Sequence, residues 1–136
     1  MAKPPTIIDL AWTRDLEFTA SAASPNSTIA IDGNSKAGPS PPQLLAYALA
    51  SCMAVDVVHV LTKGRHTVTI LRAHLTGHRA QEDPHRFVRI ELQFTIDGAA
   101  PGEAVDRAIA LSRDKYCSVW HSLRQDIQFD VTWNRP

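Results

Sequence analysis

The stretch from Ser40 to Gly64 constrains the fold more than any other part of this chain, because it is long, almost entirely apolar and bounded by helix-end signals. Ser40 can accept a hydrogen bond from the first backbone N–H groups of a helix, and Pro41 suits the first helical position, where no N–H is needed. Lys63 suits the negative end of the helix dipole, and Gly64 can take the left-handed conformation that closes a helix. The sequence therefore predicts one long helix that is buried on most of its faces.

This helix is apolar enough to raise the question of a membrane span. Its longest run without a charged or histidine side chain extends from Pro41 to Val55, which is shorter than the ~20 residues that a bilayer requires. Asp56 and His59 follow directly. The beginning of the chain, residues 1–5, has no apolar segment of the kind found in a secretory signal. We therefore expect a core helix of a cytoplasmic protein and no membrane partner.

The composition narrows the class of partner. The 136 residues carry 14 basic and 14 acidic side chains, scattered along the chain, so the formal net charge is zero. A nucleic-acid-binding protein usually has a basic patch, so nucleic acid is excluded as a main partner. The length suits a single domain over residues 1–136. The two cysteines are 65 positions apart and no Cys/His group has metal-ligand spacing, which fits a reducing compartment and predicts neither a metal nor another cofactor.

The remaining sequence predicts an α+β protein, with antiparallel sheet covering the long helix. Residues 87–97 alternate strictly between apolar and polar side chains, which indicates a strand with one face on the core and the other in water. The apolar phase of the preceding strand slips between Ile70 and Leu71, which predicts a bulge. The predicted strands are 7–12, 16–22, 28–32, 68–77, 87–97 and 127–133, and the further helices are 102–114 and a short one ending near Arg124.

Cys52, in the middle of the long helix, and Cys117, near the end of the chain, are the two candidates for chemistry. A cysteine in a buried helix is by default a small hydrophobic residue. Cys117 follows a break in a helix, where unpaired backbone amides can face a thiolate. If the two thiols meet, one of them can attack an oxidant and become a sulfenic acid. The other thiol can then condense with the sulfenic acid to form a disulfide. The sequence alone leaves open whether they meet.

Three polar residues near the cysteines were weighed for a role. Asp56 lies one helical turn after Cys52 on the same face and would raise the pKa of that thiol, so it better suits a buried polar group or a partner chain. His59 lies about 10 Å along the helix from Cys52, which is too far for contact. His121, four residues after Cys117, is within reach only if a helix begins at Cys117. The other four histidines lie in exposed segments without metal spacing: His66, His74, His78 and His85.

Two segments resemble the OsmC/Ohr family: Gly38–Val58, which contains Cys52, and Lys115–Val119, which contains Cys117. The match is to the shorter branch of the family, which carries a Lys-Tyr-Cys-Ser-Val segment. The resemblance implies an intertwined homodimer in which the long helices lie between two curved antiparallel sheets, with active sites at the subunit interface. It also implies a cysteine peroxidase for organic hydroperoxides, in which Cys52 attacks the peroxide and Cys117 resolves the sulfenic acid as a disulfide. A dithiol of the dihydrolipoyl kind would be the reductant.

The resemblance extends less well to the rest of the active site. In the peroxidases an arginine between the first two strands holds the thiolate, and Arg14 occupies a matching place. A glutamate ten residues before the first cysteine orients that arginine, but here the position is Pro42 and its neighbour is Gln43. Because neither can supply a negative charge, we expect either weaker activation of Cys52 or a substitute carboxylate, Glu17 or Asp15.

Two other functions fit the same sequence. A non-catalytic member of the fold could bind a small hydrophobic ligand in the apolar dimer pocket, with the cysteines serving as packing or as a redox sensor. The missing acidic residue favours this reading, whereas the presence of both cysteine segments favours the peroxidase. A Cys–His hydrolase is the third possibility, and it is disfavoured because no histidine has a convincing relation to Cys52.

Overall fold

A computed structural model of the protein describes residues 2–136. The chain forms two compact units, Met1–Leu45 and Ala46–Pro136, which are described in turn. The elements are β1 (Asp9–Arg14), β2 (Glu17–Ala22), β3 (Ser27–Asp32), α1 (Pro41–Lys63), β4 (Val68–Arg79), β5 (Phe87–Gly98), α2 (Gly102–Leu111), a π-helical turn (Ser112–Tyr116), α3 (Ser118–His121) and β6 (Gln128–Asn134). All the predicted strands and helices are present, with ends that differ by a few residues.

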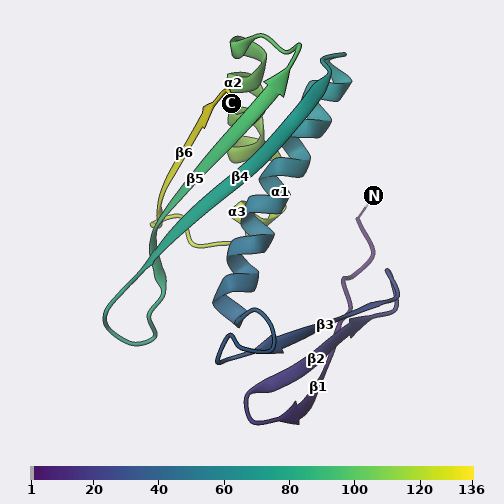
Figure 1. The fold of residues 1–136 in the computed structure, drawn as a ribbon, viewed down its shortest axis with the longest axis vertical. Coiled ribbons are helices and arrows are strands. Elements are labelled where there is room, and N and C mark those ends of the chain that lie inside the picture. Colours follow the sequence, from purple (N-terminus) through teal and green to yellow (C-terminus); the bar gives the residue numbers. More distant parts are fainter. Residues whose placement is uncertain (1) are drawn as a thin grey trace. The chain divides into compact units, whose positions relative to one another are not determined.

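The first unit is an antiparallel meander in the order β1-β2-β3 (Figure 1). The loop that follows β3 is organised by Asp32, which is buried and accepts backbone N–H bonds from Asn34, Lys36 and Ala37 at 2.8 to 3.1 Å. These bonds, of which that from Ala37 has the largest effect, hold the pKa of Asp32 below its usual value. The loop delivers the chain to the beginning of α1.

The N-terminus of α1 is closed by two reciprocal hydrogen bonds between Ser40 and Gln43. The Gln43 amide oxygen accepts the Ser40 N–H at 2.9 Å, and the Ser40 hydroxyl oxygen accepts the Gln43 N–H at 3.4 Å. This pair is a capping box, which satisfies two backbone donors that the helix itself leaves without partners. The predicted capping role of Ser40 is confirmed, and Gln43 has a structural role at the position next to the missing glutamate.

The C-terminus of α1 differs from the prediction by one residue. Gly64 follows the last residue of α1 and still donates its N–H to the Val60 carbonyl, and Arg65 takes the left-handed conformation instead, at φ +64°. The His66 N–H bonds the Leu61 carbonyl and the Arg65 N–H bonds the Thr62 carbonyl, both at 2.9 Å. This double closure is a Schellman motif. Its hydrogen bonds offset the roughly 1 kcal/mol that a left-handed arginine costs.

The second unit contains a mixed sheet in the order β4-β5-β6, which corrects the expectation of purely antiparallel pairing. The β4–β5 hairpin is antiparallel, but β6 runs parallel to β5. A parallel neighbour requires a crossover connection, and the segment containing α2 and α3 supplies it. The register of β4 against β5 shifts between Val68 and Ile70, so the predicted bulge exists slightly earlier than expected.

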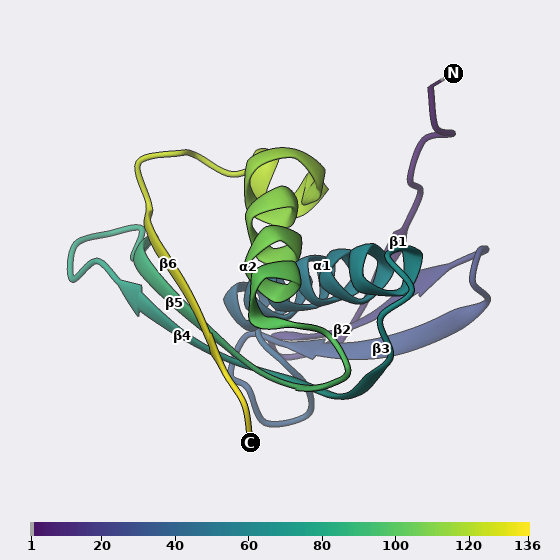
Figure 2. The same cartoon turned by 90° about the horizontal axis from the view of Figure 1, so that it is seen from above.

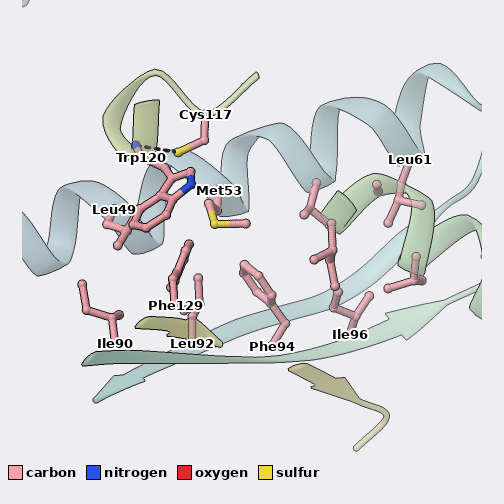
Figure 3. Close-up of a cluster of buried hydrophobic side chains, with 14 of the residues drawn as sticks. Leu49, Met53, Leu61, Ile90, Leu92, Phe94, Ile96, Cys117, Trp120 and Phe129 are labelled. Carbon is pink, nitrogen blue, oxygen red and sulfur yellow. Dashed lines mark hydrogen bonds between the residues drawn. The ribbon is translucent and has the colours of Figure 1, made fainter. Parts of the chain in front are cut away.

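The helices of the second unit cover one face of this sheet, as Figures 1 and 2 show from two directions. Alternate residues of β5 point into the resulting core, as the sequence pattern predicted, and Figure 3 shows them facing α1 and Trp120. The ring of Trp120 packs against Phe129 at a centroid distance of 4.5 Å. The central core residues are Leu49, Met53, Val57, Leu61, Ile90, Leu92, Phe94, Ile96, Val105, Ala108, Cys117, Trp120 and Phe129.

Helix α1 is buried along one stripe and not on most of its faces, which corrects the prediction. Its buried residues recur every fourth position, from Leu49 to Leu61, because a three-stranded sheet and α2 can cover only one side of it. Tyr47 and Val55 lie outside this stripe and are each 66% exposed. By length and apolarity α1 could cross a membrane, but its buried stripe makes it the core helix of this fold.

Candidate active site

The structure places Cys52 and Cys117 side by side, which answers the question that the sequence left open. Cys52 lies on α1 and Cys117 lies between the π-helical turn and α3. Both cysteines are thiols. Their sulfur atoms and a carboxylate oxygen of Asp56 all lie within 4.8 Å of one another. The two thiols are therefore close enough to react with each other after small side-chain movements.

An irregular helix end positions Cys117. The predicted helix over residues 102–114 changes character at Ser112, where α-helical bonding gives way to a π-helical turn in which the Cys117 N–H reaches back to the Ser112 carbonyl at 2.8 Å. Cys117 itself has an extended backbone and caps α3, and its sulfur accepts the Trp120 N–H at 3.4 Å (Figure 3). The expectation that backbone amides face this thiol is confirmed. Its side chain is fully buried.

Cys52 has a different environment. It is partly exposed on α1, and its sulfur lies 3.7 Å from the Ser118 hydroxyl oxygen. The Val119 N–H lowers the pKa of this thiol. Two consecutive residues of α3 therefore act on the two thiols: Val119 lowers the pKa of Cys52, and the Trp120 N–H donates to the Cys117 sulfur. The sequence did not reveal this arrangement, although Ser118 and Val119 lie in the same short segment as Cys117.

The two thiols differ in acidity. Partial burial raises the pKa of Cys52, but hydrogen bonds from the Val119 N–H, the Ser118 hydroxyl and the Cys117 thiol outweigh it, so the pKa falls below the usual 9.0. Burial raises the pKa of Cys117 to about 11, against the effect of the Trp120 N–H, and the neighbouring Cys52 and Asp56 raise it further. At neutral pH Cys52 is therefore the more readily ionised thiol, and Cys117 stays protonated.

Asp56 links the thiols to α2 through Ser112. The Ser112 hydroxyl, which is fully buried, donates to a carboxylate oxygen of Asp56 at 2.7 Å. The prediction that Asp56 satisfies a buried polar group is confirmed, and its charge opposes ionisation of both thiols as expected. Sequence reasoning missed Ser112. Its signal was a serine continuing the spacing of the buried residues Val105, Ala108 and Ile109 on α2.

The histidines take no part in this site. Within residues 2–136, no hydrogen bond joins the ring of His59 or His121 to either thiol. The His121 backbone N–H bonds the Cys117 carbonyl at 3.0 Å, and its side chain is exposed. A hydrolase built on a Cys–His pair therefore has no support from the geometry.

Arg14 lies at the end of β1 in the first unit. Its guanidinium is largely exposed and pairs with the Glu17 carboxylate at 3.1 Å. Glu17 is one of the two carboxylates expected to replace the missing glutamate. The partnership of Arg14 with Cys52 stays a prediction.

A cleft of about 890 Å³ opens within the second unit and is lined by Asp56, the carboxylate next to the thiols. It is bounded by α1, α2 and the π-helical turn, and Asp56 and Tyr116 line its wall nearest the thiols. Further along α1 the lining is mixed, with Val60 and Leu61 beside His59 and Lys63. The cleft gives small molecules a route to Asp56.

The fold and the site together define an α+β protein with two neighbouring thiols between a long core helix and a short second helix. The family model described as OsmC-like protein matches residues 33–132. The chain therefore belongs to the OsmC-like family, as the resemblance indicated.

Individual relatives agree with this assignment. The protein is 41% identical to Protein YhfA of Escherichia coli K12 over 110 residues, covering 79% of this chain and 81% of YhfA. A hypothetical protein from Aquifex aeolicus has the same fold, with a TM-score of 0.89 and 25% identity over 98% of both chains. A more distant structure, with a TM-score of 0.71, 16% identity and coverage of 98% and 99%, is described as an organic hydroperoxide resistance protein OsmC from Legionella pneumophila.

Proposed function

We propose that this protein is a thiol peroxidase that reduces organic hydroperoxides and, less readily, hydrogen peroxide. The observation that carries the proposal is the unequal thiol pair. Cys52 is partly exposed and has a lowered pKa, whereas Cys117 is buried and has a pKa of about 11. A peroxidase needs this inequality, because one thiol must attack as a thiolate while the other stays reduced until the first is oxidised.

The reaction divides into two steps. The Cys52 thiolate attacks the outer oxygen of the hydroperoxide, the O–O bond breaks, and the departing alkoxide takes a proton to leave as an alcohol. Cys52 is then a sulfenic acid. The Cys117 sulfur attacks the Cys52 sulfur, the S–O bond breaks, and the Cys117 proton and the hydroxide leave as water. The product is a Cys52–Cys117 disulfide, and the peroxide has been reduced by two electrons.

Arg14 is the proposed electrostatic partner of the Cys52 thiolate. A guanidinium near a thiol stabilises the thiolate and lowers the pKa further. The ion pair with Glu17 would orient Arg14 in place of the glutamate that is absent at Pro42. Glu17→Gln is then expected to raise the apparent pKa of Cys52 alkylation, and an unchanged value would remove Glu17 from this role.

The relatives support the chemistry at the level of the family. The Legionella structure carries a name that refers to resistance to organic hydroperoxides, and the same fold is present here.

Intact mass spectrometry tests the proposal directly. One equivalent of cumene hydroperoxide is added to the reduced protein, which is then alkylated and weighed. We expect rapid loss of both alkylatable thiols and a mass lower by two hydrogens. Two thiols that stay alkylatable for minutes in folded protein would contradict the peroxidase. In Cys52→Ser, the peroxide should remain unconsumed.

We propose further that the protein works as a homodimer. The side of α1 away from the core exposes Tyr47 and Val55, each 66% exposed, and Val58. A second copy would remove this apolar surface from water. Sedimentation equilibrium should give twice the chain mass at micromolar concentration, and Val55→Lys should shift the distribution toward the monomer. A monomeric wild-type protein would contradict the dimer.

A dithiol would complete the catalytic cycle by reducing the disulfide. Reduction by a dithiol proceeds through a mixed disulfide that the second thiol of the reductant resolves. Dihydrolipoamide should therefore support repeated turnover, and glutathione at the same thiol concentration should support less. Equal rates would argue against a dihydrolipoyl-type reductant.

Binding of a small hydrophobic ligand is the second candidate, and the cleft of about 890 Å³ favours it. If the protein is a binder and not a peroxidase, Cys52→Ser should retain ligand affinity while the wild-type protein fails to consume peroxide. If it is a peroxidase, Cys52→Ser should lose peroxide consumption.

A further inference from the structure

The thiol pair and Asp56 have a second chemical property that is independent of peroxide. Three groups that bind metals as anions, two sulfurs and a carboxylate oxygen, lie within 4.8 Å of one another. Cys52 and Asp56 are one helical turn apart on α1, and Cys117 meets them from the junction before α3. The sequence spacing did not show this group, because its third member is more than 60 residues away.

We propose that the reduced protein binds one Zn²⁺ ion per chain through Cys52, Asp56 and Cys117. Two thiolates and one carboxylate form a ligand set that suits a borderline-soft cation better than Mg²⁺ or Ca²⁺. A water molecule would take the fourth tetrahedral position.

The geometry is close to what zinc requires. Tetrahedral coordination with Zn–S bonds of about 2.3 Å and Zn–O bonds of about 2.0–2.2 Å places the ligand atoms roughly 3.5–3.8 Å apart. The three atoms here lie within 4.8 Å of one another, so each separation has to shorten by at most about 1.3 Å to complete the site. Rotation about the side-chain bonds of Cys52 and Asp56, which are both only partly buried, can supply such movements.

Hydrogen-bond donors already surround the three ligands. The Ser112 hydroxyl donates to Asp56 at 2.7 Å and orients its carboxylate. The Trp120 N–H donates to the Cys117 sulfur at 3.4 Å, and Ser118 lies 3.7 Å from the Cys52 sulfur. Outer hydrogen bonds of this kind orient ligands and tune metal affinity. The cleft that Asp56 lines offers the ion a path inward.

Binding exchanges protons without any redox change. Each thiol loses one proton to solvent and forms one Zn–S bond, so two protons are released per ion. The thiolates are then held by the metal and are no longer available to attack an oxidant. A disulfide between Cys52 and Cys117 removes both thiolate ligands, so only the reduced protein binds zinc. The inference does not require the protein to be a peroxidase.

The test uses metal-free, reduced protein titrated with Zn²⁺ against a chromogenic chelator, and with Co²⁺ as a spectroscopic substitute. We expect one ion per chain and a near-ultraviolet sulfur-to-cobalt charge-transfer band. Asp56→Asn, whose amide oxygen can still accept from Ser112, should weaken zinc binding at least about tenfold. The control, Asp83→Asn, removes the carboxylate of the exposed Asp83–His85 pair at 3.1 Å, where adventitious zinc would bind, and should leave the affinity unchanged.

Wild-type protein oxidised with diamide provides a second measurement that needs no variant. Diamide forms the disulfide without peroxide, so this measurement separates the zinc site from the peroxidase. Loss of zinc binding on oxidation, with recovery after reduction, is expected. The proposal is overturned if Co²⁺ gives no sulfur charge-transfer band, if oxidised protein binds zinc as tightly as reduced protein, or if folded Asp56→Asn binds like wild type.

Discussion

Cys52 and Cys117 are chemically identical side chains in two different backbone environments. Cys52 lies on a regular helix and is partly exposed, and the Val119 N–H, the Ser118 hydroxyl and the Cys117 thiol lower its pKa. Cys117 follows a π-helical turn, is fully buried and has a pKa of about 11. The difference in pKa between the two thiols therefore arises from burial and from the hydrogen-bond donors near each sulfur. The cysteine side chain itself contributes nothing to it.

The most direct way to break this comparison is to remove each thiol in turn. Cys52→Ser should reduce peroxide consumption to the uncatalysed rate, because the attacking sulfur is gone. Cys117→Ser should still react once with cumene hydroperoxide but should accumulate a sulfenic acid, since no partner resolves it. Stopped-flow peroxide consumption and mass spectrometry after dimedone trapping measure the two outcomes. If neither variant reacts even once with the peroxide, the two thiols do not have separate roles.

The acidity difference can be sharpened by alkylation. A pKa below 9.0 for Cys52 and of about 11 for Cys117 implies at least about a hundredfold difference in thiolate population near pH 8. We expect iodoacetamide to modify Cys52 at least about a hundred times faster than Cys117, because burial slows Cys117 further. Peptide mapping of time points gives both rates. Similar rates in folded protein would contradict the difference.

The two serines near the thiols offer a matched pair of substitutions. Ser112→Ala removes a buried 2.7 Å hydrogen bond to a carboxylate and should lower the free energy of unfolding by about 1–2 kcal/mol. Ser118→Ala removes a weaker 3.7 Å contact at an exposed serine, and should cost less than about 0.5 kcal/mol while raising the pKa of Cys52. Urea unfolding and pH-dependent alkylation measure these effects. The opposite order of stability would assign the structural role to Ser118.

The smallest effect is the pH dependence of stability. The raised pKa of Cys117 means that its stabilising contribution is present below the usual thiol pKa of 9.0 and is lost as the pH rises toward about 11. The lowered pKa of Cys52 in the folded protein has the opposite effect. Its stabilising contribution grows as the pH rises from this folded-state pKa to the unfolded value of 9.0, and it remains constant above 9.0. Urea unfolding under reducing conditions should therefore show a decline above pH 9.0 that is weaker in Cys117→Ala. A decline of the same size in that variant would assign it to other groups.

Most of the fold could be predicted because its signals are local. The capping residue Ser40 and the alternation in residues 87–97 depend on neighbours in the chain, so α1 and β5 were found nearly to the residue. The parallel pairing of β6 and the left-handed Arg65 were missed. The pairing of β6 depends on where a distant segment lies, and the conformation of Arg65 depends on which of several competing hydrogen bonds forms.

The sequence by itself determined the elements, the family and the identity of the two candidate thiols. Only the tertiary structure decided that Cys52, Cys117 and Asp56 meet, that Ser112 holds the carboxylate, and that the Trp120 N–H donates to the Cys117 sulfur. The physical reason is the distance along the chain over which each interaction acts. Hydrogen-bond capping and apolar periodicity act over a few residues, whereas the pKa of a thiol depends on burial and on donors brought from far along the chain.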